Sequence, residues 1–173
     1  MVLSNNDGNA VAVSEEAKAL GIVRGASAHE LRALIRRCGL HVLSSNYAIY
    51  GDLSARLMAV LGQFTPRLEV YSIDEAFLDL SGLDEAAALA HAREIVRTVR
   101  QWLGLPVSVG IAPTKVLAKV ANRIAKKQKI PGGAVALLER DRHTEALAAL
   151  ATAEVWGIAG RGSAKLKTLG IET

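Results

Sequence analysis

Apolar stripes with a helical period predict two long helices, at residues 84–103 and 114–127. Shorter helices are predicted at residues 14–20, 27–39, 53–61, 145–150 and 164–169. Strand-like apolar runs predict strands at residues 1–3, 10–13, 40–43, 107–111 and 134–138, and a hairpin at 68–80. Because helical and strand-like segments alternate along the chain, the fold class is expected to be α+β or α/β.

Polar residues and glycines indicate where these elements begin, turn and end. The segment Asn6-Asp7-Gly8 is typical of a hairpin turn between the first two strands. Ser14 is placed to cap a helix that ends at Gly21. The segment Ser27-Ala28-His29-Glu30 has the spacing of a capping box, which predicts the start of the next helix, and Gly39 predicts its end.

Two adjacent acids, Asp74 and Glu75, interrupt an otherwise apolar run, YSIDEAFLDLSG, at residues 71–82. The neighbours expected to bury against a core are Val70, Ile73, Ala76, Phe77, Leu78 and Leu80. Carboxylates in such surroundings are usually paired or bound to a metal, and a divalent cation with oxygen ligands suits phosphate chemistry. The alternative is a solvent-facing hairpin tip whose acids cap the turn.

The helix predicted at residues 114–127 places four cations on one face, within about 80° of arc at 100° per residue. These cations are Lys115, Lys119, Arg123 and Lys126. No acid lies between them, so a bound polyanion would explain a face whose charges repel one another. A solvated helix face is the alternative.

Composition and charge narrow the class of protein. Half of the 173 residues are hydrophobic, which is enough for a buried core, but no apolar run approaches the length of a membrane span. The opening residues do not have the pattern of a signal peptide, and the single Cys38 excludes an internal disulfide and fits the reducing cytoplasm. Residues 111–173 carry 11 Lys and Arg against 5 Asp and Glu, which suits nucleic acid, although an ordinary basic surface is the alternative.

The segment SIDEAFLD at residues 72–79 resembles the signature of the Y-family, or translesion, DNA polymerases. Further segments resemble the UmuC subgroup of that family, and they occur in the same order along nearly the whole chain. They are LSNNDG (3–8), EAKALGI (16–22), RRCG (36–39), SSNY (44–47), VGIAPTKVLAKVANRIAKK (109–127) and VWGI (155–158).

The resemblance implies a right-hand polymerase fold and divides the chain into three parts. Residues 1–46 are expected to be fingers, residues 47–140 the palm, and residues 141–173 the start of a helical thumb. The palm is expected to be one antiparallel or mixed sheet, backed by the helices at 84–103 and 114–127. The two acids would then face the cleft on the opposite side of the sheet.

The resemblance also implies the chemistry, which is template-directed addition of deoxynucleotides, often opposite damaged bases, in the SOS response. Asp74 and Glu75 are expected to be catalytic and to hold Mg²⁺ in a two-metal site. Lys18 and Lys126 are expected to bind the nucleotide, with Lys126 reaching the incoming triphosphate. The expected DNA contacts are Lys115, Lys119, Arg123, Gly157, Gly160 and Lys165, the last three in a segment that resembles the first part of a helix-hairpin-helix.

The implied partners are primer–template DNA, deoxynucleoside triphosphates, a UmuD-type accessory subunit, the recombinase filament and the sliding clamp, all in the cytoplasm.

Three positions depart from the family pattern. Glu15 stands where the family carries a Tyr or a small residue, Val13 stands where UmuC relatives tend to carry Arg, and Ala159 stands at the third place of the Gly-hydrophobic-Gly pattern.

The chain begins, with Met1-Val2-Leu3-Ser4, within the segment that reads V-V-L-S-N-N-D-G in the family, so the family's opening strand, which lies upstream and carries a third metal-binding carboxylate, is expected to be missing. The rest of the thumb and the DNA-gripping domain are also expected to be missing. The chain is therefore interpreted as an internal piece of a UmuC-type polymerase that is inactive by itself. The alternative is a protein of another functional class, a non-catalytic remnant that binds DNA or a partner protein.

Overall fold

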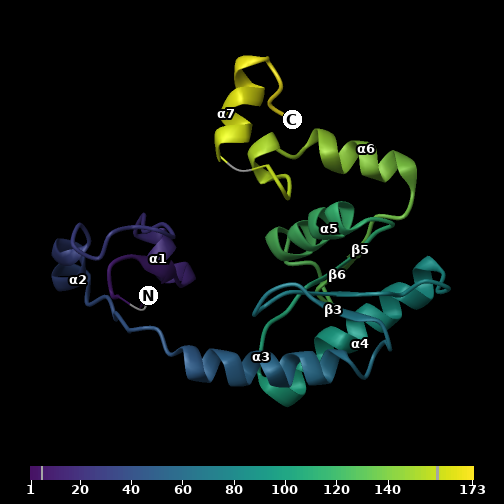
Figure 1. Cartoon of the computed structure of the whole chain (residues 1–173), viewed down its shortest axis with the longest axis horizontal. Helices are drawn as coiled ribbons and strands as arrows, with labels where there is room; N and C mark the ends of the chain where they lie inside the picture. The colour runs from purple at the N-terminus through teal and green to yellow at the C-terminus, as the bar shows by residue number, and fades with distance from the viewer. Residues whose placement is uncertain (5, 159) are drawn as a thin grey trace. The chain divides into compact units, whose positions relative to one another are not determined.

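The computed structural model describes residues 1–4, 6–158 and 160–173, and these form two compact units. The first unit comprises residues 1–52 and the second comprises residues 53–173. Helix α3 (Tyr47–Leu61) begins in the first unit and continues into the second. Figure 1 shows the order of the helices and strands along the chain. No described helix combines the length and the apolar composition that are needed to cross a membrane.

The first unit begins with the predicted hairpin. Strands β1 (Val2–Leu3) and β2 (Ala10–Ala12) pair antiparallel. The turn between them contains Asp7 at a positive φ of 52°. The strand predicted at residues 40–43 is reduced to an isolated bridge between Val2 and Leu43.

Two short helices complete the first unit. The hydroxyl of Ser14 caps α1 (Glu15–Ala19) by accepting a hydrogen bond from the backbone N–H of Ala17, as predicted. Helix α2 (Arg32–Cys38) ends at Gly39 as predicted, but it begins after Leu31 without a side-chain cap. The predicted capping box is wrong because Ser27 forms a β-bridge with Asn9 instead.

The second unit contains the larger core and the remaining elements. Its strands are β3 (Leu68–Val70), β4 (Ala76–Leu78), β5 (Val109–Ile111) and β6 (Ala134–Ala136). Its helices after α3 are α4 (Glu85–Leu103), α5 (Lys115–Lys127), α6 (Arg140–Ala148), the 3₁₀ turn η1 (Thr152–Glu154) and α7 (Gly160–Thr168). The two long helices match their predicted ranges because Asp84 and Thr114 cap them through their side-chain oxygens.

The strands of the second unit form separate pairs and not the single sheet that was expected. Strands β3 and β4 form an antiparallel hairpin, and β5 and β6 form a parallel pair joined through α5. No described strand hydrogen-bonds one pair to the other. A groove of about 800 Å³ lies between the two strand pairs and is lined by residues of both β4 and β5.

Helices α4 and α5 cover opposite faces of the β5–β6 pair, so the expectation that both helices back one face is wrong (Figure 1). Ile111, Ala134 and Ala136 pack with Ala88 and Ala92 of α4. The alternate residue Val135 packs with the cluster that contains Val120 and Ala121 of α5. The alternation of side chains along each strand therefore separates the two helices.

Gly110 allows α5 to lie directly against β5. A Cβ at this position would lie 2.1 Å from the carbonyl oxygen of Ala118 and 2.1 Å from the backbone nitrogen of Asn122. Only glycine fits between the strand and the helix at that separation.

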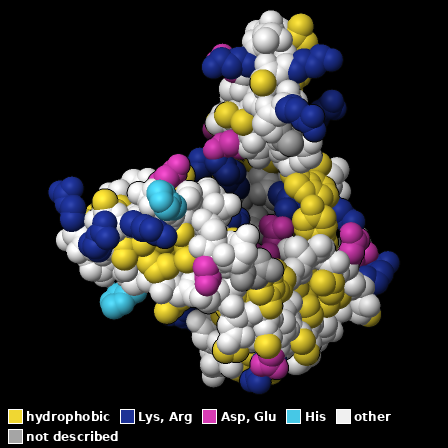
Figure 2. All heavy atoms as spheres, turned by 60° about the vertical axis from the view of Figure 1, so that its left-hand side comes forward, with side chains coloured by type: hydrophobic (Ala, Val, Ile, Leu, Met, Phe, Trp, Pro, Cys, Tyr) yellow, Lys and Arg dark blue, Asp and Glu magenta, His cyan; other side chains and the backbone are white. Residues whose placement is uncertain are grey.

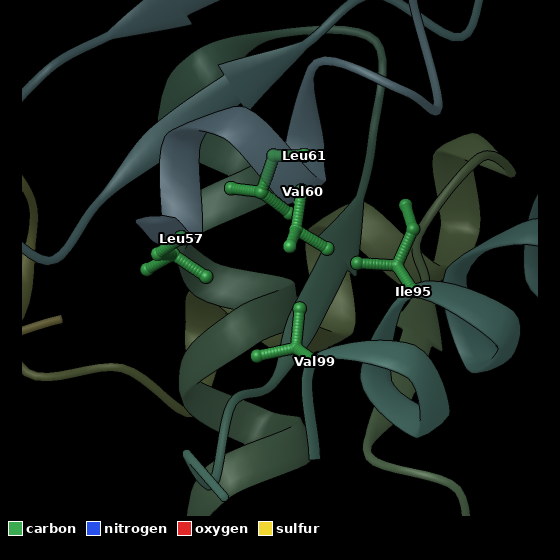
Figure 3. Close-up of a cluster of buried hydrophobic side chains, with 5 residues drawn as sticks. All are labelled: Leu57, Val60, Leu61, Ile95 and Val99. Carbon is green, nitrogen blue, oxygen red and sulfur yellow. The ribbon is translucent and has the colours of Figure 1, made fainter. Parts of the chain in front are cut away.

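The main hydrophobic core of the second unit lies between α3 and α4. Its buried side chains are Leu57, Val60, Leu61, Ile95 and Val99 (Figure 3). Partly buried Leu68, Ala76 and Leu78 of the β3–β4 hairpin pack against this cluster. The core therefore anchors the hairpin that carries the two adjacent acids.

Candidate functional site

The two acids lie in the tight turn that joins β3 to β4. The backbone N–H groups of Tyr71 and Ser72 both donate to the carbonyl oxygen of Glu75, at 3.0 Å each. The hydroxyl of Ser72 donates to a carboxylate oxygen of Asp74 at 2.9 Å. Both acidic residues are exposed, which agrees with the interpretation of a solvent-facing hairpin tip. We call residues 71–75 the acidic turn.

Two of the apolar neighbours are not buried as expected. Val70 is 57% exposed and Ile73 is 49% exposed, whereas Ala76, Phe77 and Leu78 are half-buried. The reason is that each strand of the hairpin is only three residues long, so the acidic turn projects beyond the core that covers β4.

Three of the four cations on the predicted basic face of α5 are ion-paired with acids from other elements. Lys115 binds Glu69 of β3, with one N–O distance of 2.6 Å. The ammonium of Lys119 lies 3.0 and 3.1 Å from the two carboxylate oxygens of Glu75. Arg123 binds Glu154 of η1, and Lys127 lies 3.6 Å from the same carboxylate.

The expectation that this face lacks counter-charges is therefore wrong. Its counter-charges come from segments that are distant in the sequence, so inspection of the helix alone could not find them. Figure 2 shows both basic and acidic side chains on the face in view.

Lys126 differs from the other cations of this face. Its side chain is exposed, and its ammonium has no hydrogen bond or ion pair to any residue within the described ranges.

Lys18, in the first unit, is exposed and binds Glu15 at 2.6 Å. Glu15 and Glu16 begin α1, where acids suit the helix dipole, and hydrogen bonds from its own backbone and from Ser14 lower the pKa of Glu16.

Aromatic side chains surround the ammonium of Lys119. It lies 4.7 Å from the ring centroid of Tyr71 and 5.2 Å from that of Trp156. The indole N–H of Trp156 donates to the hydroxyl of Tyr71 at 3.0 Å. Phe77 adds a third ring, 5.7 Å from Tyr71 and 5.9 Å from Trp156. Sequence reasoning did not find this cluster, because nothing in the local pattern indicates that Trp156 lies beside Tyr71.

The groove between β4 and β5 brings several of the predicted site residues together. Its lining includes Asp74 and Glu75 of the acidic turn and Lys115 and Lys119 of α5. Lys126 is not among its lining residues. Carboxylates and ammonium groups thus share one concave surface within the second unit, an arrangement that can hold polar or charged groups.

The segment that resembles a DNA-binding hairpin is only partly described. Gly157 is exposed with a positive φ of 96°, Gly160 begins α7, and Lys165 is exposed on that helix. Ala159, at the departure from the family pattern, lies outside the described residues, as does Asn5 of the LSNNDG segment. The role of this segment in DNA binding stays a prediction.

By itself, the acidic turn supplies too few ligands for the two-metal site that the resemblance implies. Such a site needs several hard oxygen ligands around each ion, and this turn offers two carboxylates, of which Glu75 is engaged by Lys119. No group of three or more His, Cys, Asp or Glu residues that could hold a metal ion occurs within residues 1–4, 6–158 and 160–173.

Comparisons with known proteins show similarity along the whole chain. A model of the impB/mucB/samB family matches residues 1–123. UmuC of Salmonella typhimurium is 47% identical over 175 residues, an alignment that covers 100% of this chain and 42% of the relative. The chain therefore spans less than half the length of this curated relative.

Solved structures agree with the sequence comparison. A ternary complex of Dbh superimposes with a TM-score of 0.80 at 25% identity, over 99% of this chain and 50% of that chain. A Y-family DNA polymerase chimera of Dbh and Dpo4 gives 0.81 at 26% identity, over 96% of this chain and 47% of that chain. These matches confirm the α+β palm-type fold and the resemblance to UmuC-type translesion polymerases, and the chain belongs to the impB/mucB/samB family.

Proposed function

We propose that this chain contributes the nucleotide-handling part of a polymerase that copies DNA past damaged template bases. The observation that carries the proposal is the single groove in which the acidic turn meets the basic helix α5. Carboxylates that can hold divalent cations beside ammonium groups that can bind phosphate suit phosphoryl transfer. The proposal covers the activity of a longer polypeptide, since the chain matches 42% of UmuC.

Within this proposal the chain divides as the resemblance implies. Residues 1–46 contribute to the fingers, residues 47–140 to the palm and residues 141–173 to the start of the thumb. Asp74 and Glu75 contribute ligands for magnesium, and the remaining ligands come from outside the acidic turn. Lys126 neutralises the incoming triphosphate from α5, and Lys18 contributes from the fingers.

DNA contacts belong to the basic residues and glycines nearer the C-terminal end. Gly157 and Gly160 contribute phosphate contacts at the start of α7, and Lys165 contributes one from the last turn of that helix. Lys115, Lys119 and Arg123 contribute only if DNA or nucleotide competes with the acids that they now bind. For this reason we assign them less of the binding energy than Lys126 or Lys165.

The partners proposed for the longer polypeptide follow from the family. They are primer–template DNA, deoxynucleoside triphosphates, a UmuD-type accessory subunit, the recombinase filament and the sliding clamp. The setting is the SOS response in the cytoplasm.

A second candidate function is a non-catalytic remnant that binds DNA or a partner protein. One observation favours it: Glu75 is engaged by Lys119, and the acidic turn alone supplies too few carboxylates for two metal ions. Such a remnant would keep the surface of a polymerase but would not catalyse nucleotide addition.

A chimera distinguishes the two candidates. The matching segment of Salmonella typhimurium UmuC is replaced by this chain, and the purified protein is assayed for extension of a primer across a damaged template base. A polymerase part supports extension at a rate within about tenfold of UmuC, because UmuC supplies everything else. A folded chimera that binds primer–template DNA but extends no primer would support the remnant and reject the catalytic proposal.

A further inference from the structure

The proposed function uses Gly157 of the VWGI segment but gives no role to Trp156, the residue directly before it. The two residues that precede Trp156 are fixed against α5. Glu154 forms an ion pair with Arg123, and Val155 packs against a buried hydrophobic cluster that includes residues of α5. The side chain of Trp156 is therefore presented from a well-anchored stretch of backbone.

Trp156 reaches the first residue of the acidic turn. Its indole N–H donates to the hydroxyl of Tyr71 at 3.0 Å, and the two rings meet edge to face with their centroids 5.3 Å apart. The ring of Phe77 lies 5.7 Å from that of Tyr71 and 5.9 Å from that of Trp156. The backbone N–H of Tyr71 donates to the carbonyl oxygen of Glu75 at 3.0 Å. Trp156 is thus connected to Glu75 through Tyr71.

The ring of Trp156 makes a second contact, with Lys119. The ammonium of Lys119 lies 5.2 Å from the centroid of this ring, and 3.0 and 3.1 Å from the two carboxylate oxygens of Glu75. The hydrogen bond between Trp156 and Tyr71 does not involve the lysine, so the two contacts are separate. Trp156 therefore supports the acidic turn by its N–H group and by the face of its ring.

The acidic turn has little other support. The strands that carry it are three residues long, and its flanking residues Val70 and Ile73 are 57% and 49% exposed. A segment with few buried contacts opens locally at low cost. Catalytic groups, in contrast, must be held close to one geometry, because small displacements lower the rate.

From these contacts we propose that Trp156 is a positioning residue, which holds the acidic turn through Tyr71 in the conformation in which Asp74 and Glu75 act. The segment between η1 and α7 thereby determines the geometry of a turn that lies far from it in the sequence. This inference rests on the proposed function, which gives the two acids their chemical role.

The first test uses the 173-residue chain and does not depend on activity. Trp156→Leu removes both the N–H donor and the aromatic ring. The amide hydrogens of Tyr71 and Ser72, whose N–H groups close the turn, should then exchange about tenfold faster in NMR experiments. The amide of Leu137, which donates to β5, is the internal control and should exchange within about twofold of its rate in the parent chain.

The second test uses the UmuC chimera. Trp156→Phe keeps an aromatic ring but removes the donor, and Tyr71→Phe removes the acceptor. Each should lower kcat for nucleotide incorporation by about fivefold and leave the Kd for primer–template DNA within about twofold of the parent value. The double variant should lose no more than either single variant, because both remove the same hydrogen bond.

Trp102→Phe is the matched control. It makes the same exchange at the other tryptophan of the chain, which is 57% exposed on α4. Its kcat should stay within about twofold of the parent chimera. Because Tyr71→Phe removes the hydrogen bond from the other side, the test stands even if Trp156→Phe does not fold.

The outcomes separate the inference from the proposed function. Unchanged exchange of the Tyr71 and Ser72 amides in Trp156→Leu would overturn the claim that Trp156 holds the turn. Extension that is lost in Asp74→Asn but keeps its parent kcat in Trp156→Phe and Tyr71→Phe would overturn the positioning role and leave the proposed function intact. A loss of kcat in Trp102→Phe as large as in Trp156→Phe would also overturn the positioning role. Extension that Asp74→Asn does not reduce would overturn the proposed function, whatever the exchange rates show.

Discussion

At the scale of single residues, the cations of α5 differ in whether an acidic side chain already binds them. Lys115, Lys119 and Arg123 are held by acids of β3, the acidic turn and η1. The ammonium of Lys126 has no such partner within the described ranges, and its side chain is exposed. A mobile, unpaired ammonium is the form in which lysine acts on a phosphate. Lys126 is therefore the strongest candidate for the triphosphate.

Lys126→Ala should impair nucleotide incorporation far more than Lys115→Ala. In the UmuC chimera, loss of a charge that acts on the transition state lowers kcat and kcat/KM together, by about a hundredfold. Lys115→Ala breaks an exposed ion pair, which typically contributes about 0–1 kcal/mol. Single-nucleotide incorporation kinetics on an undamaged template measure both variants. Equal, small losses would mean that Lys126 is an ordinary surface lysine.

The helical period was sufficient to place these cations on one face, but not to find their partners. Glu69, Glu75 and Glu154 lie 46, 44 and 31 residues from the cations that they bind. Pairings over such distances depend on how the hairpin and η1 pack around α5. The same holds for Tyr71 and Trp156, which lie 85 residues apart. The types of residue at the site could therefore be predicted from the sequence, but which of them bind one another could not.

At the scale of elements, the β3–β4 hairpin is closed at its base by Asp79. Its carboxylate binds Arg67 at 2.9 Å and accepts from the backbone N–H of Ser81 at 2.8 Å. Hydrogen bonds from Ser81, together with the charge of Arg67, hold the pKa of Asp79 below its ordinary value of 3.8. These contacts fix the end of the hairpin opposite the acidic turn.

Asp79→Asn should lower stability at neutral pH and have little effect in acid. A carboxyl group with a lowered folded-state pKa contributes stability above its unfolded pKa, and the contribution is lost as pH falls through the folded value. The difference in Tm between the parent chain and the variant should therefore be present at pH 7 and close below an unfolded pKa near 3.8. A difference that stays constant between pH 7 and pH 2 would show that the charge of Asp79 does not contribute.

Gly110→Ala should destabilise the second unit, because its added Cβ would overlap backbone atoms of α5 at 2.1 Å. Overpacking of this kind costs about 1–3 kcal/mol or more, since a whole helix must move. Gly51→Ala is the matched control, because an added Cβ there meets no atom within 4 Å and lies on the helix α3. Urea unfolding should show a large loss for the first variant only, and equal stability of the two would contradict the close packing of α5 on β5.

The elements themselves were largely predictable, and the exceptions have physical causes. Long amphipathic helices with good caps, such as α4 and α5, matched because local sequence determines both their period and their ends. The capping box at Ser27 failed because a bridge to Asn9 uses this segment as extended chain. Local propensity is overridden where a tertiary hydrogen bond competes for the same backbone.

At the scale of the whole molecule, the order of motifs predicted the family, and the comparisons confirmed it. The arrangement of the sheet was not predictable in the same way. A single palm sheet was expected, but the described strands form separate pairs with a groove between β4 and β5. Pairing between strands depends on every strand that is present, so a pattern read from one segment cannot establish it.

The distribution of charge is also a property of the whole molecule. The chain has a formal net charge of +4, concentrated in its C-terminal third, which suits association with a polyanion. Internal ion pairs engage part of that charge within α5 and η1. The exposed cations Lys126 and Lys165 therefore contribute most to the proposed contacts with nucleotide and DNA.

The most direct measurement of the central claim is primer extension by the UmuC chimera with and without Asp74→Asn. If the acidic turn is the site of phosphoryl transfer, Asp74→Asn should reduce extension by at least about a hundredfold while the protein still binds primer–template DNA. Glu69→Gln, an acid of the same groove that is paired with Lys115, should retain extension within about threefold of the parent chimera. Extension by Asp74→Asn at the rate of the parent chimera would contradict the account.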